Sequence, residues 1–351
     1  MIDLRSDTLT TPTREMLEAV LTAPLGDDDR THELGRGEDP TVNELEDLAA
    51  RITGKQAAVL MPSGCMANTA AVLAQVKPGS TLLVDEQQHL LISEKYLFDP
   101  DFGRMRARTY RHDAQGRPVL ADIEARLAEG GVGLVCVENT HNYAGGAAIP
   151  PERLESVHRL ARAAGVPVHM DGARLFNAAV ALKVAPKELC RHVDTLMFCL
   201  SKGLSAPVGS LVCGPQDTIL EVRRMRKALG GAMRQAGVIA APGLVALRRN
   251  VERLAEDHGN ARAFAERIAG LRHTRLVGAV ATNIAVVDVS SCCPDPLRYC
   301  ELAAERGLIV RPVLKRYIRF VFYRGVTRAD ALAAADIVRA LDAELGAQAD
   351  A

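Results

Sequence analysis

The sequence predicts an α/β fold with a mostly parallel sheet and helices on both of its faces. Short apolar runs alternate with helical patterns through the middle of the chain, which is typical of this class. The chain has 351 residues, more than one compact domain usually needs, so we expect two domains. The expected strands are Ala57–Met61, Thr81–Val84, Gly133–Val137, Pro167–Met170, Thr195–Leu200 and Ser210–Cys213.

The boundary between the two domains is expected on a long helix. A largely helical pattern runs from Val238 to Asp257, with Pro242 best placed near a helix start. We therefore predict an N-terminal segment at residues 1–25, a large domain at 26–240 and a small C-terminal domain at 241–351. The small domain has the composition of an α+β unit, with helices at 261–271 and 329–345 and apolar runs at 284–289, 308–312 and 317–323.

Charge and composition narrow the class of protein. Lys plus Arg and Asp plus Glu number 43 each, so the formal charge is zero and indicates neither a nucleic acid nor an anionic membrane as partner. No apolar run approaches the length of a membrane span, and the first residues lack an apolar signal segment, so we expect a cytoplasmic protein. None of the eight cysteines forms a CxxC pair, and we expect reduced thiols and no metal site.

Polar residues follow four of the expected strands. In open parallel sheets, ligands bind outside the carboxyl ends of the strands. Because these ends meet at one edge, polar groups from separate strands are expected to converge there. The four segments are Pro62–Asn68, Glu138–Asn142, Asp171–Arg174 and Ser201–Gly203.

These groups suit pyridoxal phosphate. The cofactor needs a lysine amine for its aldehyde, an acid beside its ring nitrogen and backbone donors for its phosphate. Lys202, Asp171 and the Ser63–Cys65 turn can fill these three roles. An imidazole over the ring face would complete the set, and either His89 or His141 can supply it.

A set of segments between Ile2 and about Gly237 carries a family pattern. Together they resemble the low-specificity L-threonine aldolases, fold-type I pyridoxal phosphate enzymes of the beta-eliminating lyase superfamily. The resemblance implies a seven-stranded, mostly parallel sheet, a smaller C-terminal α+β domain, and cleavage of a β-hydroxy-α-amino acid to glycine and an aldehyde. The segments are Ile2–Thr8, Gly37–Asn43, Pro62–Asn68, Glu138–Asn142, Asp171–Asn177, Leu200–Leu204, Ala206–Ser210 and Met233–Gly237.

The resemblance also implies how the cofactor is held. Lys202 carries it as a Schiff base, Asp171 pairs with the pyridinium nitrogen, and His89 stacks on the ring. The family forms dimers or tetramers with shared active sites, so we expect a homo-oligomer. The cofactor-binding set is completed by Arg174, by the phosphate ligands Ser63, Gly64 and Cys65 of the same chain, and by Arg234, which reaches the phosphate from a neighbouring subunit.

For the amino-acid substrate, the resemblance implies a carboxylate clamp and a proton acceptor. Ser6, Arg174 and Arg319 hold the α-carboxylate, and bidentate arginine binding would orient the bond to be broken. His141 lies near the β-hydroxyl. Either His89 or His141 is a reasonable base because imidazole titrates near neutral pH, and a water held by the cofactor phosphate is the alternative.

Four departures from the family pattern put the substrate in doubt. We therefore expect a preference for a β-hydroxy-α-amino acid other than threonine, or another reaction at Cα or Cβ. The departures are a longer loop at 29–36 with Arg36 where a tyrosine is expected, Cys65 for threonine, an extra Gln87 or Gln88, and Tyr323 for histidine.

Two alternative functions follow from the same residues. Within pyridoxal phosphate chemistry, the chain could be a β-eliminating lyase or another enzyme acting at Cα. Outside it, the chain could be a catalytically silent scaffold of this fold, although the intact Lys202, Asp171 and Arg174 argue against that.

Overall fold

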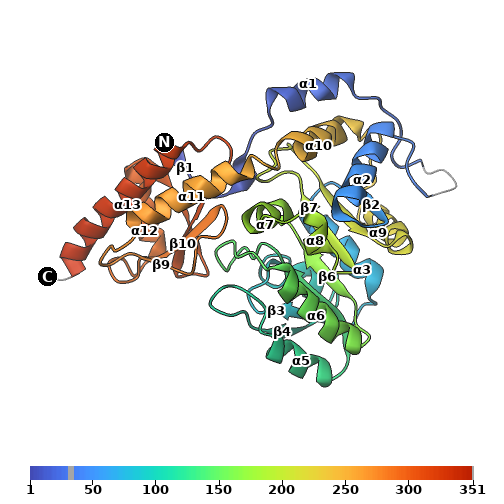
Figure 1. Cartoon of the computed structure of the whole chain (residues 1–351), viewed down its shortest axis with the longest axis horizontal. Helices are drawn as coiled ribbons and strands as arrows, with labels where there is room; N and C mark the ends of the chain where they lie inside the picture. Colours follow the sequence, from blue (N-terminus) through green and yellow to red (C-terminus); the bar gives the residue numbers. More distant parts are fainter. Residues whose placement is uncertain (31–34, 350–351) are drawn as a thin grey trace.

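A seven-stranded sheet forms the centre of the protein (Figure 1). The computed structural model describes residues 1–30 and 35–349. β8 runs antiparallel to both of its neighbours, and the other strands are parallel to one another, which confirms the predicted α/β fold. The order across the sheet is β2 (Ala57–Met61), β8 (Ser210–Gly214), β7 (Thr195–Cys199), β6 (Val168–Asp171), β5 (Val132–Glu138), β3 (Thr81–Asp85) and β4 (Arg106–Tyr110).

The edge strand β4 has no counterpart among the strands expected from apolar runs. Its sequence, Arg-Ala-Arg-Thr-Tyr, contains no such run, and Tyr110 is its one buried side chain. β4 pairs with β3 alone. An edge strand with one neighbour needs little apolar surface, so periodicity does not reveal it.

Helices cover both faces of this sheet. Successive residues of β7 point to opposite sides: Leu196 and Phe198 join one apolar core, and Met197 and Cys199 join the other. The first core is covered by α2 (Pro40–Thr53), α5 (Leu120–Ala128), α6 (Pro151–Ala163), α7 (Leu175–Leu182), α8 (Pro186–Cys190) and α10 (Gly237–Arg249), and the opposite face by α3 (Gly64–Gln75), α4 (His89–Ile92), η2 (Lys95–Phe98) and α9 (Gln216–Ala228).

A second, four-stranded sheet follows in the chain and has its own apolar core. Phe264 packs against Phe320 and Phe322 there, with ring centroids 4.6 and 5.5 Å apart. The predicted boundaries of the two domains stay predictions. The sheet order is β12 (Arg311–Val313), β13 (Tyr317–Val321), β10 (Ile284–Asp288) and β9 (Arg275–Leu276), with helices α11 (Leu254–Ile268), α12 (Pro296–Glu305) and α13 (Arg328–Ala349).

The long helix expected at the junction is instead two helices, α10 and α11. The break falls at Asn250, whose buried amide donates to Leu204 O (2.8 Å), and a turn leads into α11. Pro242 lies inside α10 rather than near its start. No helix in the described residues is both long enough and apolar enough to cross a membrane.

The N-terminal segment crosses from the small sheet to the large one. β1 (Ile2–Asp3) pairs in parallel with β11 (Leu308–Ile309), and Leu4 is buried in the core of the small sheet. The chain then passes the short helix η1 (Asp7–Leu9) and reaches α1 (Arg14–Thr22), which lies along α10 (Figure 1). This path brings the residues around η1 between the two sheets.

Candidate active site

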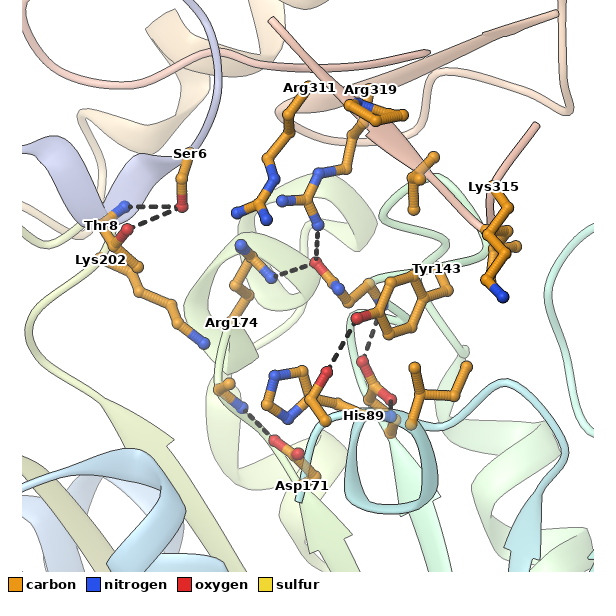
Figure 2. A pocket seen from close by; sticks show the side chains of 18 residues that line it. Ser6, Thr8, His89, Tyr143, Asp171, Arg174, Lys202, Arg311, Lys315 and Arg319 are labelled. Atoms are coloured by element: carbon orange, nitrogen blue, oxygen red, sulfur yellow. Dashed lines mark hydrogen bonds between the residues drawn. The ribbon is translucent and has the colours of Figure 1, made fainter. Parts of the chain in front are cut away.

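A cavity of about 650 Å³ lies where the carboxyl ends of β5, β6 and β7 face the small sheet (Figure 2). This is the edge at which open parallel sheets bind ligands. Residues from both sheets and from the N-terminal segment line this cavity. The predicted site residues that line the cavity are Ser6, His89, Asp171, Arg174, Lys202 and Arg319.

Asp171 is held by a chain of buried hydrogen bonds. The side-chain amide of Asn68 donates to Asp171 Oδ2 and to Glu94 Oε1, both at 3.0 Å. Asn68 Oδ1 lies 3.2 Å from His169 Nε2, and His169 Nδ1 lies 2.9 Å from Thr195 Oγ1. Each of these five side chains is no more than 1% exposed.

The two carboxylates fix the direction of every hydrogen bond in this network. Asn68 must turn its NH₂ group toward Asp171 and Glu94, which leaves Oδ1 as an acceptor. His169 therefore donates from Nε2 and accepts at Nδ1 from the Thr195 hydroxyl. Burial lowers the pKa of His169 to about 4, which keeps the ring neutral in this role.

His89 begins α4 and is oriented by two acids. Its Nδ1 lies 2.9 Å from Glu94 Oε1, and its backbone N–H donates to Glu138 Oε2 (2.7 Å). Burial favours the neutral ring, but the hydrogen bond to Glu94 and the charges of Asp171 and Glu138 raise the pKa of His89 above its usual value. With Nδ1 engaged, Nε2 is the ring nitrogen left to exchange a proton.

Arg174 and Arg319 meet at the amide of Asn142. Arg174 Nη1 and Arg319 Nη1 donate to Asn142 Oδ1 at 3.1 and 2.8 Å. Arg174 is also paired with buried Asp7 through Nε (2.7 Å) and Nη2 (2.8 Å). Burial alone would raise the pKa of Asp7, but Arg174 brings it down to about 2. Much of Arg174 is thus occupied within the protein.

Arg319 is less well satisfied than Arg174. It is 8% exposed, and its Nε has no hydrogen-bond partner among the described residues. Burial lowers the pKa of Arg319 to about 10, and the nearby Arg174 contributes in the same direction. A buried guanidinium with mainly neutral partners favours an anionic ligand.

Ser6 caps a short helix at the edge of the cavity. Its Oγ accepts from the backbone N–H of Thr8 (3.2 Å) and caps η1, and its side chain also lines the cavity. Thr10 Oγ1 donates to Lys202 O (2.8 Å), which ties the N-terminal segment to the lysine loop.

His141 does not line the cavity and lies buried in a cluster with Asp85 and His112. His141 Nε2 is 3.2 Å from Asp85 Oδ1, and His112 Nδ1 is 3.1 Å from the same atom. Three such ligand atoms could hold a metal. However, His141 Nδ1 accepts from the backbone N–H of Ala144 (3.2 Å), so the neutral ring carries its proton on Nε2 and cannot ligate through it.

The turn before α3 does not line the cavity either. Ser63 caps the helix by accepting from Met66 N (3.2 Å), and Gly64 and Cys65 are its first residues. Gly64 packs closely on β7, because a Cβ there would lie 2.8 Å from Cys199 Sγ. The start of α3 therefore lies against the strand that leads to Lys202.

Several cavity residues have no role in the sequence prediction. Glu138 and Asn142 belong to a polar segment after a strand, and that position is the sequence signal that identifies them. Arg311 and Lys315 line the cavity from the small sheet and from the turn that follows β12. Isolated cations in a short strand and a turn carry no recognisable pattern.

Residues 3–292 match the model of the beta-eliminating lyase family. A probable low-specificity L-threonine aldolase 2 from Arabidopsis thaliana is 38% identical over 94% of both chains. A low specificity L-threonine aldolase from Escherichia coli (strain K12) is 41% identical over 76% of this chain and 79% of that protein. The chain belongs to the beta-eliminating lyase family.

Two solved structures superpose on nearly the whole of this chain and share its fold. A threonine aldolase from Leishmania major superposes with a TM-score of 0.80 at 15% identity, covering 97% of this chain and all (100%) of that one. A putative L-allo-threonine aldolase from Listeria monocytogenes gives a TM-score of 0.75 at 19% identity, covering 97% and 96%. Both likenesses extend over the small sheet as well as the large one.

The family departures lie mostly outside the cavity. Arg36 Nη1 pairs with Asp47 (2.9 Å), and the Tyr323 hydroxyl donates to Asp3 O (3.0 Å), so both side chains have partners within the protein. Neither lines the cavity. Of the longer loop before Arg36, residues 31–34 lie outside the described part of the chain.

Arg234 is also outside the cavity of its own chain. Its guanidinium lies 3.2 Å from Asp27 Oδ2 and 3.4 Å from Asp29 Oδ2. Its side chain is 66% exposed. A contact between Arg234 and a phosphate would therefore involve another subunit.

Proposed function

We propose that this chain is a pyridoxal phosphate enzyme that cleaves β-hydroxy-α-amino acids of the threonine and allo-threonine type to glycine and an aldehyde. The observation that carries the proposal is that Asp171, at the end of β6, and Lys202, just beyond the end of the neighbouring β7, line one cavity with Arg319. An amine, an acid and a carboxylate-binding cation are the groups that this chemistry requires. The names of the similar proteins supply the type of substrate.

The residues present fit the cofactor. The first N–H groups of α3 have no acceptor within the helix and suit a phosphate. Beside this turn, Ser210 Oγ is buried without a partner in the described residues, and it lies 3.6 Å from where a Cβ of Gly64 would be. Asp171 would hold the ring nitrogen and Lys202 the aldehyde carbon. The bound cofactor supplies an electron-accepting ring that stores the electron pair released at Cα.

The side chains of the protein orient the substrate and move the proton. Arg319 binds the α-carboxylate, and Ser6 and Arg174 border the same space. We assign removal of the β-hydroxyl proton to His89, because it lines the cavity and Glu94 occupies its Nδ1. His141, the other candidate base, is buried beside Asp85 and would act through another group.

We further propose that the chain works as a homodimer or homotetramer. Leu17, Leu21, Leu25 and Val238 are apolar side chains that are 39–85% exposed, on α1, after it and at the start of α10. Apolar surface of this kind supports contact with a second copy. Arg234 of the partner subunit would then reach the phosphate.

Product analysis tests the reaction. The protein, incubated with pyridoxal phosphate and L-threonine, is expected to release glycine and acetaldehyde in equal amounts. A keto acid and ammonia would instead identify the β-eliminating alternative. Absence of both products with a panel of β-hydroxy-α-amino acids would contradict the proposal.

Substitution of the lysine tests the site. Lys202→Ala is expected to remove the visible absorption of the bound cofactor and to abolish aldehyde release. Lys187→Ala, at an exposed position on α8, is the matched control and should keep both. Unchanged absorption in Lys202→Ala would assign the cofactor to another residue.

A further inference from the structure

Two arginines face each other on the small sheet beside the cavity. Arg311 of β12 and Arg319 of β13 are direct partners in the antiparallel register, so their side chains emerge on the same face. Figure 2 shows both directed into the cavity, opposite His89 and Asp171. Like charges placed directly opposite each other are destabilising, and an anion bound between them would relieve the repulsion.

The acids of the cavity do not neutralise these arginines. Glu138 accepts from the backbone N–H groups of His89 (2.7 Å) and Asn142 (2.8 Å). Asp171 accepts from Asn68 and from the backbone N–H of Ala173 (3.0 Å). Both carboxylates are thus held on the large-sheet side.

The small-sheet side keeps a surplus of positive charge. Among the described residues, neither Arg311 nor Lys315 has a side-chain hydrogen bond or an ion pair. Arg319 donates to two neutral oxygens, Asn142 Oδ1 and Arg5 O. The nearby acid Asp7 also acts on the charge of Arg319, but its hydrogen bonds are to Arg174. A single α-carboxylate bound at Arg319 would leave Arg311 and Lys315 without a counter-charge.

The turn after β12 presents Lys315 in an uncommon backbone conformation. Leu314 and Lys315 have φ angles of 51° and 58°, in the left-handed region that residues with a side chain seldom adopt. Both side chains line the cavity. Uncommon backbone at a cavity wall is often retained for ligand contact.

We propose that the preferred substrate is a β-hydroxy-α-amino acid whose side chain carries a second anionic group, which Arg311 and Lys315 bind. This inference rests on the proposed aldolase activity and specifies its substrate class. The second anion can be a carboxylate, as in 3-hydroxyaspartate, or a phosphate, as in 4-hydroxythreonine phosphorylated at its Cγ hydroxyl. A guanidinium and an ammonium accept both.

The cleavage balances without any further reactant. For 3-hydroxyaspartate, the β-hydroxyl loses its proton, the Cα–Cβ bond breaks and its electron pair stays at Cα. Cα then takes up one proton. The products are glycine and glyoxylate, and the second carboxylate leaves on the aldehyde fragment.

The test compares kcat/KM for threonine, 3-hydroxyaspartate and 4-hydroxythreonine phosphorylated at its Cγ hydroxyl. The wild-type enzyme is expected to favour one anionic substrate over threonine by at least about tenfold. Arg311→Gln should reduce this ratio about tenfold or more, because one charged hydrogen bond contributes roughly that much. The substrate that shows the preference distinguishes carboxylate from phosphate.

A nearby arginine provides the control. Arg316→Gln removes an arginine that pairs with Asp288 (3.1 Å) and does not line the cavity, so it should leave the ratio unchanged. Calorimetry adds a binding readout without turnover: succinate, a dianion, should bind the holoenzyme more tightly than butyrate, and Arg311→Gln should remove the difference.

The outcomes separate this inference from the proposed function. Threonine cleaved at least as well as both anionic substrates, or a ratio that Arg311→Gln does not change, would overturn the inference and leave the aldolase activity in place. A failure to cleave any of the three substrates would overturn both.

Discussion

The two sides of the cavity differ in how their polar groups are satisfied. On the large-sheet side, Asp171, Glu94 and His169 are joined through Asn68 by hydrogen bonds of 3.0–3.2 Å. On the small-sheet side, Arg311 has no such partner among the described residues, and Arg319 Nε is unpaired. The first side is organised by the protein itself, whereas the second has cations whose hydrogen bonds a ligand would complete.

This difference predicts separate effects for substitutions on the two sides. Breaking the large-sheet network should lower stability and cofactor affinity, because buried charges lose their donors. Changing the small-sheet cations should mainly alter substrate binding.

Asn68→Ala should be the most damaging change. It removes the donor shared by Asp171 and Glu94 and leaves both buried carboxylates short of a hydrogen bond. We expect the free energy of unfolding to fall by about 3 kcal/mol and the cofactor to bind about tenfold more weakly. Chemical denaturation and titration of the apoprotein with pyridoxal phosphate measure the two effects.

Asn260→Ala is the matched control, since Asn260 is also a buried amide but donates to Val326 O (2.9 Å), outside the cavity. It should lower stability without changing cofactor affinity. Equal loss of cofactor affinity in both variants would mean that Asn68 acts through stability alone.

Arg319→Lys tests the small-sheet side. Lysine keeps the charge but cannot bind a carboxylate through two parallel donors. We expect KM for the amino acid to rise about 10- to 100-fold, the equivalent of one or two charged hydrogen bonds, with stability changing less than in Asn68→Ala. Arg324→Lys, outside the cavity, should leave KM unchanged. An unaltered KM in Arg319→Lys would place the carboxylate elsewhere.

His169 gives the network a pH dependence. The pKa of His169 is lowered to about 4, whereas the unfolded residue titrates near 6.5. Between these values the unfolded chain binds the proton and the folded chain does not. Stability is therefore lost as the pH falls from 6.5 to 4, with no further loss from this residue below 4.

His169→Gln should weaken that dependence. Glutamine can donate to Asn68 and accept from Thr195 without titrating. We expect the loss of unfolding free energy between pH 6.5 and 4 to be smaller than in the wild type by about 2 kcal/mol, measured by urea denaturation. Identical pH profiles would show that His169 does not titrate in this window.

Tyr323→Phe should have the smallest effect. Its hydroxyl donates to Asp3 O (3.0 Å) and joins the N-terminal segment to the small sheet, outside the cavity. Loss of that hydrogen bond should lower the free energy of unfolding by about 1 kcal/mol and leave KM unchanged. A raised KM would mean that Tyr323 contacts the substrate, as its position in the family pattern had indicated.

The sequence alone determined most strands of the large sheet and the edge of the sheet at which the site lies. Strands such as Thr195–Cys199 are local apolar runs, and their pattern is readable without knowing their neighbours. Since carboxyl ends of parallel strands converge, the sequence alone predicts that Lys202 and Asp171 lie in one place. Both line the cavity.

The tertiary structure decided which side chains complete the site. Asn68 reaches Asp171 across 103 positions of sequence, and Arg311 faces Arg319 only because β12 pairs with β13. His141, in a segment that the family pattern marked, turns instead toward Asp85. Such contacts depend on side-chain direction and long-range pairing, which local sequence patterns do not encode.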